Sequence, residues 1–406
     1  MLSYEEFGCL NLTNETIASR ETKPYSIVLA CDCHVGVLSR VLDVYRFFRR
    51  PPRIFLARKR RGVRVWESQI PKDPGVAVQT EFIPIPIMMS ENLNLGRAVP
   101  PFLGYLYYSL VLYLKLVRSR AGINLVHSHC IFPQGLFGLL LARLLHVPLI
   151  VTANGLDVNS FMKKSAMLRF ACLFVLKRSY TTIAVSNPIL MSLRRHGISN
   201  SVYLPNSIDV SSVLPVVKTT KKDSIIYVGT LTENKRPLVL VRAFDIVVRK
   251  VPTARLVICG DGPLMPLLRK EITSKGLEDK VELLSFVNRE TLNNCRSHAE
   301  IFVHPSASEG LSRALLEAMA AGQVVVASRN ESQEAILSDG DNSLLFEVDN
   351  SEELSSKILL AISDGNLRKR ISESAKRLCE TRFSNAVVAS RLEDVYLRAM
   401  QSPAAK

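Results

Sequence analysis

Two glutamates, Glu309 and Glu317, stand eight residues apart in the segment from His304 to Gly322. The apolar run before His304 predicts a strand, and the Leu- and Ala-rich spacing after it predicts a helix that ends at Gly322. Free backbone N–H groups at the mouth of such a helix favour an anion, and Gly310 lets a ligand approach the backbone. Carboxylates accept hydrogen bonds from the hydroxyls that sugars present. The segment predicts a site for such a ligand; the alternative is that Glu309 caps the helix and Glu317 is solvated.

A second segment carries cations just after a predicted strand. Gly229 follows the strand, and Lys235 and Arg236 precede Pro237, which is typical of the first position of a helix. A cation beside a helix N-terminus suits a diphosphate. Surface lysines at helix starts are also common, so this segment alone is a weak signal.

A third segment begins like a dinucleotide-binding fingerprint. Gly260 and Gly262 follow a predicted strand, but Pro263 comes next and no third glycine is present. No acidic residue ends the next strand, where a ribose ligand of NAD should stand. These departures argue against an NAD-dependent oxidoreductase.

In the first half, polar residues alternate where strands are expected to end. His127 and His129 share a face of one strand, so a packing role for at least one of them competes with a role at an acceptor site. Asp32 and His34 have the same spacing after the first strand. Cys31, Cys33 and His34 have no second ligand cluster to complete a metal site, so reduced core thiols are the favoured interpretation.

Short apolar runs alternate with longer helical segments along the whole chain, which is typical of parallel sheets covered on both faces. Two such series predict an α/β protein with two doubly wound domains. We expect domains at 1–205 and 206–383 and a C-terminal helix within 384–406. The expected strands are 26–30, 125–127, 148–152, 182–186, 224–229, 255–260, 301–304 and 323–327.

The net charge of +15 is concentrated in one half of the chain. Residues 1–205 hold 25 Lys and Arg against 11 Asp and Glu, whereas residues 206–406 hold 27 against 26. Eight basic residues and no acid lie between Arg49 and Arg64, and an aromatic-rich helix flanked by cations is expected at 100–120. This pattern favours binding to an anionic membrane surface over a solvated loop with a buried helix. Nucleic acid is the least favoured partner, since no nucleic-acid-binding motif accompanies the basic stretch.

No signal peptide is visible and residues 100–114 are too short to span a bilayer, so a cytoplasmic, peripheral protein is expected.

In order and spacing these segments resemble the retaining glycosyltransferases of family 4. Glu309 to Glu317 matches the family's E-x(7)-E element, and the stretches 228–235 and 259–263 match its Val-Gly-x-Leu-x(3)-Lys and Cys-Gly-Asp-Gly-Pro motifs. Residues 286–290 resemble the segment near the nucleobase, 126–129 and 152–158 the strand ends that face the cleft, and 205–209 the hinge. The resemblance implies the GT-B fold: two Rossmann-like domains facing across a cleft, with the C-terminal helix crossing back to the first domain.

The resemblance also implies roles for residues. Glu317 would bind the ribose, Glu309 the donor-sugar hydroxyls, and Lys235 the departing diphosphate, with no metal and no cofactor. The remaining residues that the resemblance brings to the site are Asn154 as catalytic, Gly229, Thr230, Arg236, Gly260, Gly262, Val287, Gly310 and Leu311 for the donor, and His127, His129 and Asp157 on the acceptor side. Asp32 and His34 are acceptor-side candidates from their spacing alone.

Three departures from the family pattern set the alternative. Thr230 stands where the family usually has Arg, Asn154 stands where it usually has His, and the Gly-rich loop after the first strand is absent.

We expect a transferase that moves a hexose from a UDP- or GDP-sugar to a hydroxyl of a lipid-linked or glycan acceptor, with no nucleic-acid partner. The alternative is a weak or inactive transferase-like scaffold subunit.

Overall fold

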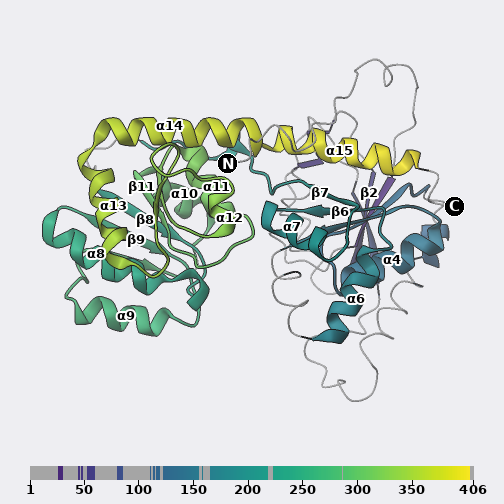
Figure 1. The fold of residues 1–406 in the computed structure, drawn as a ribbon, viewed down its shortest axis with the longest axis horizontal. Coiled ribbons are helices and arrows are strands. Elements are labelled where there is room, and N and C mark those ends of the chain that lie inside the picture. The colour runs from purple at the N-terminus through teal and green to yellow at the C-terminus, as the bar shows by residue number, and fades with distance from the viewer. Residues whose placement is uncertain are drawn as a thin grey trace.

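The computed structural model describes residues 26–30, 44–45, 47–48, 53–59, 80–85, 110, 113–114, 116–118, 122–154, 158, 165–217, 223–285 and 287–402. These residues form two parallel sheets, each with its own helices, which lie side by side along the long axis of the molecule (Figure 1).

The N-terminal sheet has the strand order β3-β2-β1-β4-β5-β6-β7. Its strands are β1 (Ser26–Ala30), β2 (Arg53–Lys59), β3 (Thr80–Ile85), β4 (Leu125–Ser128), β5 (Leu149–Ala153), β6 (Thr181–Ala184) and β7 (Ser201–Tyr203). The direction of strand addition reverses between β1 and β4. Helices α4 (Gln134–Leu145), α6 (Ala166–Leu176) and α7 (Asn187–Arg195) belong to this domain, and α4 and α6 share a buried apolar core with β4 and β5.

The C-terminal sheet repeats this plan with the order β10-β9-β8-β11-β12-β13. Its strands are β8 (Ser224–Val228), β9 (Arg255–Cys259), β10 (Val281–Leu284), β11 (Ile301–His304), β12 (Val324–Ser328) and β13 (Leu344–Phe346). One core joins the sheet to α8 (Pro237–Lys250), α9 (Met265–Ser274) and α13 (Ser351–Ser363). A second core on the other face joins it to α10 (Arg289–Ser297), α11 (Arg313–Ala321) and α14 (Gly365–Arg382).

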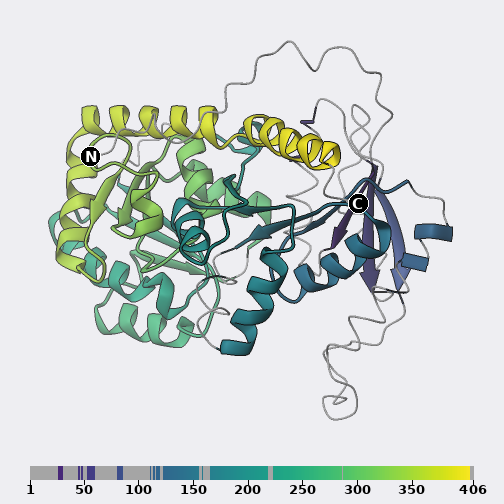
Figure 2. The ribbon, with the colours of Figure 1, turned by 45° about the vertical axis from the view of Figure 1, so that its right-hand side comes forward.

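The chain passes between the two domains twice, and the two passages lie together. Ile208 pairs with Ser384 in a parallel bridge, supported by backbone bonds from the amide of Ile208 to the carbonyl of Phe383 and from the amide of Asn385 to the carbonyl of Ile208. After this bridge α15 (Asn385–Gln401) buries one face against the N-terminal sheet. Figures 1 and 2 both show α14 along the C-terminal domain and α15 along the N-terminal one.

The observed topology confirms the expected pair of doubly wound α/β domains, and all eight expected strands are present, two with the expected bounds and six with ends shifted by one or two residues. A strand expected to end in the turn residues near Leu204 is present as β7, whereas the sequence prediction did not name β2, β3, β10 and β13. The basic stretch from Arg49 to Arg64 is therefore not the loop of the alternative interpretation. Its middle is strand β2, which pairs with β1 and β3.

Candidate active site

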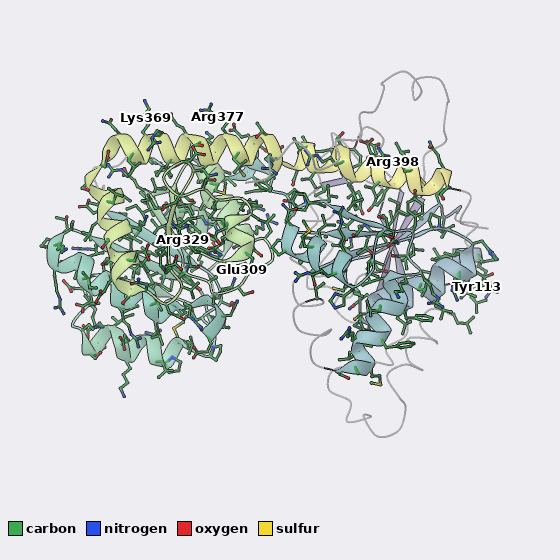
Figure 3. The ribbon with its side chains drawn as sticks, in the orientation of Figure 1. Tyr113, Glu309, Arg329, Lys369, Arg377 and Arg398 are labelled. Carbon is green, nitrogen blue, oxygen red and sulfur yellow. The ribbon has the colours of Figure 1, made fainter. Side chains whose placement is uncertain are left out.

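The candidate site lies where β8 and β11 end. These strands are neighbours in the sheet at the point where the strand order reverses, and open α/β sheets bind ligands outside such a point. The loop after β8 carries Lys235, whose Nζ is ion-paired with Oε1 of Glu309 from the loop after β11. Nε2 of His304, the last residue of β11, lies 3.2 Å from the same oxygen. Glu309 is on the side of the C-terminal domain that faces the N-terminal domain (Figure 3).

The Glu309 carboxylate is largely buried, and its charge state follows from its neighbours. Burial alone would raise its pKa, but the neighbouring His304 ring and the charge of Lys235 together lower the pKa to about 2. The carboxylate is therefore ionised throughout the neutral range and accepts hydrogen bonds without donating one.

Side-chain and backbone bonds fix the two loops to each other. Residues Glu233–Lys235 form a single 3-10 turn, and Pro237 then opens α8 at its first position, as expected. The Asn234 side chain donates to the carbonyl of Ser308 at 2.7 Å, and the amide of Ala307 donates to the carbonyl of Asn234 at 2.8 Å. These bonds keep Lys235 within reach of Glu309.

The segment after β11 differs from the sequence expectation at its start. Helix α11 begins at Arg313 with Ser312 as its N-cap, so Glu309 lies in the loop before the helix and does not cap it. The end is as expected, with Gly322 in a left-handed conformation. Glu309 therefore lies in the turn before the helix, about one turn short of its first residue, and the alternative in which it caps the helix is wrong.

Gly260 and Gly262 serve a close contact between two strand-end loops. A Cβ atom at Gly260 would stand 1.8 Å from the carbonyl oxygen of Gly229, and one at Gly262 would stand 2.5 Å from that of Leu231. The Gly229 amide donates to the Cys259 carbonyl at 3.0 Å across this contact. The described structure therefore accounts for both glycines through backbone packing, with no ligand required.

Glu317, on the second turn of α11, is held by two arginines. Its Oε2 is paired with Nη1 of Arg296, and its Oε1 accepts from Nε of Arg313 at 2.8 Å. Burial raises the pKa of Glu317, but the two guanidinium groups outweigh it and leave the pKa below its ordinary value. Each carboxylate oxygen retains a further lone pair for a ligand hydroxyl.

The other donor-side residues occupy varied positions. Thr230 is exposed, and Arg236 is paired through Nε with Asp349 Oδ1 at 2.7 Å, so its charge already faces a carboxylate. Gly310 and Val287 are half-buried. Leu311 is buried, and its carbonyl accepts from the Asn206 side chain at 3.3 Å, which connects the interdomain passage to the Glu309 loop.

His127 has a structural environment. It is buried, its Nε2 lies 2.8 Å from the Thr152 hydroxyl, and its Nδ1 is bonded to the Tyr396 hydroxyl of α15. Tyr396 is in turn 2.6 Å from the hydroxyl of Tyr45. Burial and the neighbouring His129 lower the pKa of His127 well below its usual range, so the ring is neutral. Of the two histidines, this one matches the packing alternative.

His129 and Asn154 lie together at the ends of β4 and β5. The Asn154 side chain donates to the backbone carbonyl of His129 at 2.7 Å. Burial lowers the pKa of His129 to about 4, and its Nε2 has no hydrogen-bond partner among the described residues. Asp157, Asp32 and His34 lie outside the described residues.

Sequence reasoning missed the partners that orient the two glutamates. His304 was recognised only as the end of a strand, and Arg296 has the pattern of a charge on a polar surface helix, yet its side chain is only 4% exposed. Arg313 had one local signal, because it precedes Glu317 by four residues on one helix.

Two Rossmann-like domains whose strand ends carry this site define the GT-B class of glycosyltransferases. The crystal structure of HepE from Anabaena in complex with UDP has the same fold: its TM-score is 0.71 at 16% identity, with 92% of this chain and all of that chain covered.

The chain belongs to the group 1 glycosyltransferases of the GT-B superfamily. The family model described as "Glycosyl transferases group 1" matches residues 215–378, and that of "Glycosyltransferase Family 4" matches residues 41–212. An uncharacterised glycosyltransferase of Methanocaldococcus jannaschii is 28% identical over 262 residues, which are 64% of this chain and 72% of the relative. The UDP-Gal:alpha-D-GlcNAc-diphosphoundecaprenol alpha-1,3-galactosyltransferase of Escherichia coli is 25% identical over 310 residues, 71% and 79% of the two chains.

Proposed function

We propose that this glycosyltransferase moves a hexose from a UDP- or GDP-sugar to a hydroxyl of a lipid-linked or glycan acceptor, with retention of the anomeric configuration. The observation that carries the proposal is the meeting of Lys235, His304 and Glu309 where β8 and β11 end. The UDP bound by HepE and the diphosphoundecaprenol-linked acceptor of the E. coli relative support the classes of donor and acceptor.

The roles of the charged residues follow from their positions. Glu309, ionised and lying beside His304, accepts hydrogen bonds from the donor-sugar hydroxyls, assisted by backbone N–H groups around Gly310 and Leu311. Glu317 accepts from the ribose hydroxyls. Lys235 leaves Glu309 for the diphosphate and neutralises the charge that develops there, a role that Mg²⁺ fills in other transferases. We therefore propose a reaction without a metal.

The chemical step that fits these roles is a displacement on one face of the sugar. The bond between the anomeric carbon and the diphosphate oxygen breaks as the acceptor hydroxyl oxygen bonds to the same carbon through an oxocarbenium-like state. The hydroxyl proton passes to the departing diphosphate oxygen. No carboxylate of the site is required as a covalent nucleophile.

We also propose that the enzyme acts at the cytoplasmic face of a membrane, through its basic N-terminal half. Among the described residues no helix is long and apolar enough to cross a bilayer. In the expected 100–120 helix, Leu110, Leu114 and Val117 are exposed at spacings of four and three, whereas Leu116 is buried. An apolar face of this kind suits the boundary of the lipid headgroups.

Calorimetric binding of UDP, GDP and ADP tests the donor site. One nucleotide should bind, and Glu317→Ala should weaken it about tenfold or more, which is 1.4 kcal/mol. Absence of binding to all three would refute the donor assignment.

A second candidate, a nucleotide-binding subunit without turnover, is favoured by one observation. The Asn154 amide donates to the backbone of His129, a structural use in a position where the family usually has histidine. Release of nucleoside diphosphate from a sugar donor distinguishes the two candidates. The enzyme would cleave the bound donor, whereas the non-catalytic subunit would bind the donor and leave it intact.

A further inference from the structure

Helix α6 carries an apolar stripe that none of the described residues of the domain covers. Its inner face, with Cys172, Val175 and Leu176, is buried in the core shared with α4. On the outer side Met167 is 76% exposed and Phe170 is 71% exposed. Phe174 continues the stripe at a helical spacing of four, with its ring centroid 6.3 Å from that of Phe170. Large apolar side chains that lie mostly exposed and next to one another on a helix mark an interaction surface.

Cations flank this stripe, and the sequence around α6 contains no carboxylate side chain. Arg169 and Lys177 are exposed on α6 and at its end, and Cζ of Arg178 lies 3.9 Å above the Phe174 ring. Residues 158–208 contain no Asp or Glu, and neither does α4, the helix that packs beside α6. The basic residues of that segment are Lys163, Lys164, Arg169, Lys177, Arg178, Arg194 and Arg195.

We propose that the outer face of α6, formed by Met167, Phe170 and Phe174 with Arg169, Lys177 and Arg178, docks on an anionic phospholipid surface. Apolar and aromatic side chains enter the headgroup boundary while long cationic side chains reach the phosphates around them. A protein partner would need an acidic surface of matching shape, whereas a lipid surface supplies negative charge without a fixed pattern. The inference rests on the proposed action at a membrane, but it requires nothing of the sugar donor.

Sedimentation of the full chain with vesicles tests the surface. Wild type should bind phosphatidylcholine vesicles that contain phosphatidylglycerol and should bind pure phosphatidylcholine far less. The double variant M167S/F170S should bind the anionic vesicles about tenfold more weakly or worse. The matched control L267S/L360S removes two exposed leucines from α9 and α13 of the C-terminal domain and should bind like wild type.

A tryptophan at the stripe gives a second readout, since the chain has a single native tryptophan. The emission of F170W should shift to the blue on addition of anionic vesicles and be quenched by brominated lipid, whereas that of L267W should not. Wild-type binding by M167S/F170S, an unshifted F170W, or absence of wild-type binding to anionic vesicles would each overturn the proposal. A dimer that M167S/F170S dissociates, with vesicle binding unchanged, would make this face a contact between copies instead.

UDP affinity measured on the same variants separates this inference from the proposed function. M167S/F170S should bind UDP like wild type, which also shows that it is folded. If neither wild type nor M167S/F170S binds UDP, but vesicle binding still depends on α6, the docking proposal is supported and the proposed donor site is refuted. If the donor reaction proceeds and vesicle binding ignores α6, the docking surface fails alone.

Discussion

Replacing Arg296 by methionine tests whether Glu317 is positioned for a ribose. Arg296 is nearly fully buried and its guanidinium pairs with Oε2 of Glu317, so the variant leaves a buried carboxylate with Arg313 as its remaining partner. Removing one member of a buried ion pair costs about 3–5 kcal/mol. Because Arg313 stays in place 2.8 Å away and Glu317 retains some exposure, we expect a loss at the lower end, about 3 kcal/mol, in denaturant unfolding.

The same change predicts a functional signature that a general loss of stability would not produce. In the wild type the pKa of Glu317 lies below its ordinary value. The ion pair therefore stabilises the fold fully at pH values above the pKa of Glu317 in the unfolded chain, and this stabilisation is lost as the pH falls through the lower pKa of the folded state. Without Arg296 the effect of burial gains weight and the pKa of Glu317 rises. UDP affinity should then fall more steeply in R296M than in wild type as the pH is lowered, beyond the loss that protonation of the terminal phosphate of UDP causes in both.

The assay compares UDP with 2′-deoxy-UDP by calorimetry. Wild type should prefer UDP through the ribose hydroxyl bound by Glu317, and R296M should lose most of this preference. R296K should recover part of it, and R313M should have a smaller effect because Arg313 is more exposed. An unchanged ratio between the two nucleotides in R296M, whatever its stability, would refute the positioning role of Arg296.

Three further outcomes follow from the packing and the site. Tyr396→Phe removes the hydroxyl that binds His127, so it should lower the free energy of unfolding by about 2–4 kcal/mol in guanidinium titration; a change under about 0.5 kcal/mol would show the bonds to be unimportant. Gly260→Ala places its β-carbon 1.8 Å from a carbonyl oxygen and should give a strongly destabilised chain, whereas Gly122→Ala, with open space around it, should melt close to wild type. Glu309→Gln should slow sugar transfer about 100-fold with little change in UDP affinity, measured by nucleotide release and calorimetry; full activity would exclude Glu309 from the mechanism.

Much of the fold was predictable because a parallel strand covered on both faces is apolar along most of its length. The eight strands found from sequence are such runs. Edge strands β10 and β13 are only three or four residues long and are too short for that signal. Strand β2 was hidden by its arginines, since the pattern of charge resembled a surface loop.

The site was predictable as far as local spacing reaches. Glu309, Glu317 and Lys235 stand in motifs at strand ends, and the order of the strands brings them to one edge of the sheet. The partners of these residues come from tertiary packing, which no local pattern encodes. Arg296 meets Glu317 across 21 residues, and His127 meets Tyr396 across 269.

Transfer of labelled sugar tests the central claim most directly. Purified wild-type chain is incubated with UDP- and GDP-sugars, each radiolabelled in the hexose, and with a membrane lipid extract as acceptor, beside Lys235→Ala and Glu309→Gln. We predict that one donor labels the lipid fraction with release of one nucleoside diphosphate per sugar, and that both variants lose this labelling. If the chain binds a nucleotide sugar but releases no nucleoside diphosphate and labels no lipid with any donor, the account is contradicted. The chain would then be a nucleotide-binding subunit without transferase activity.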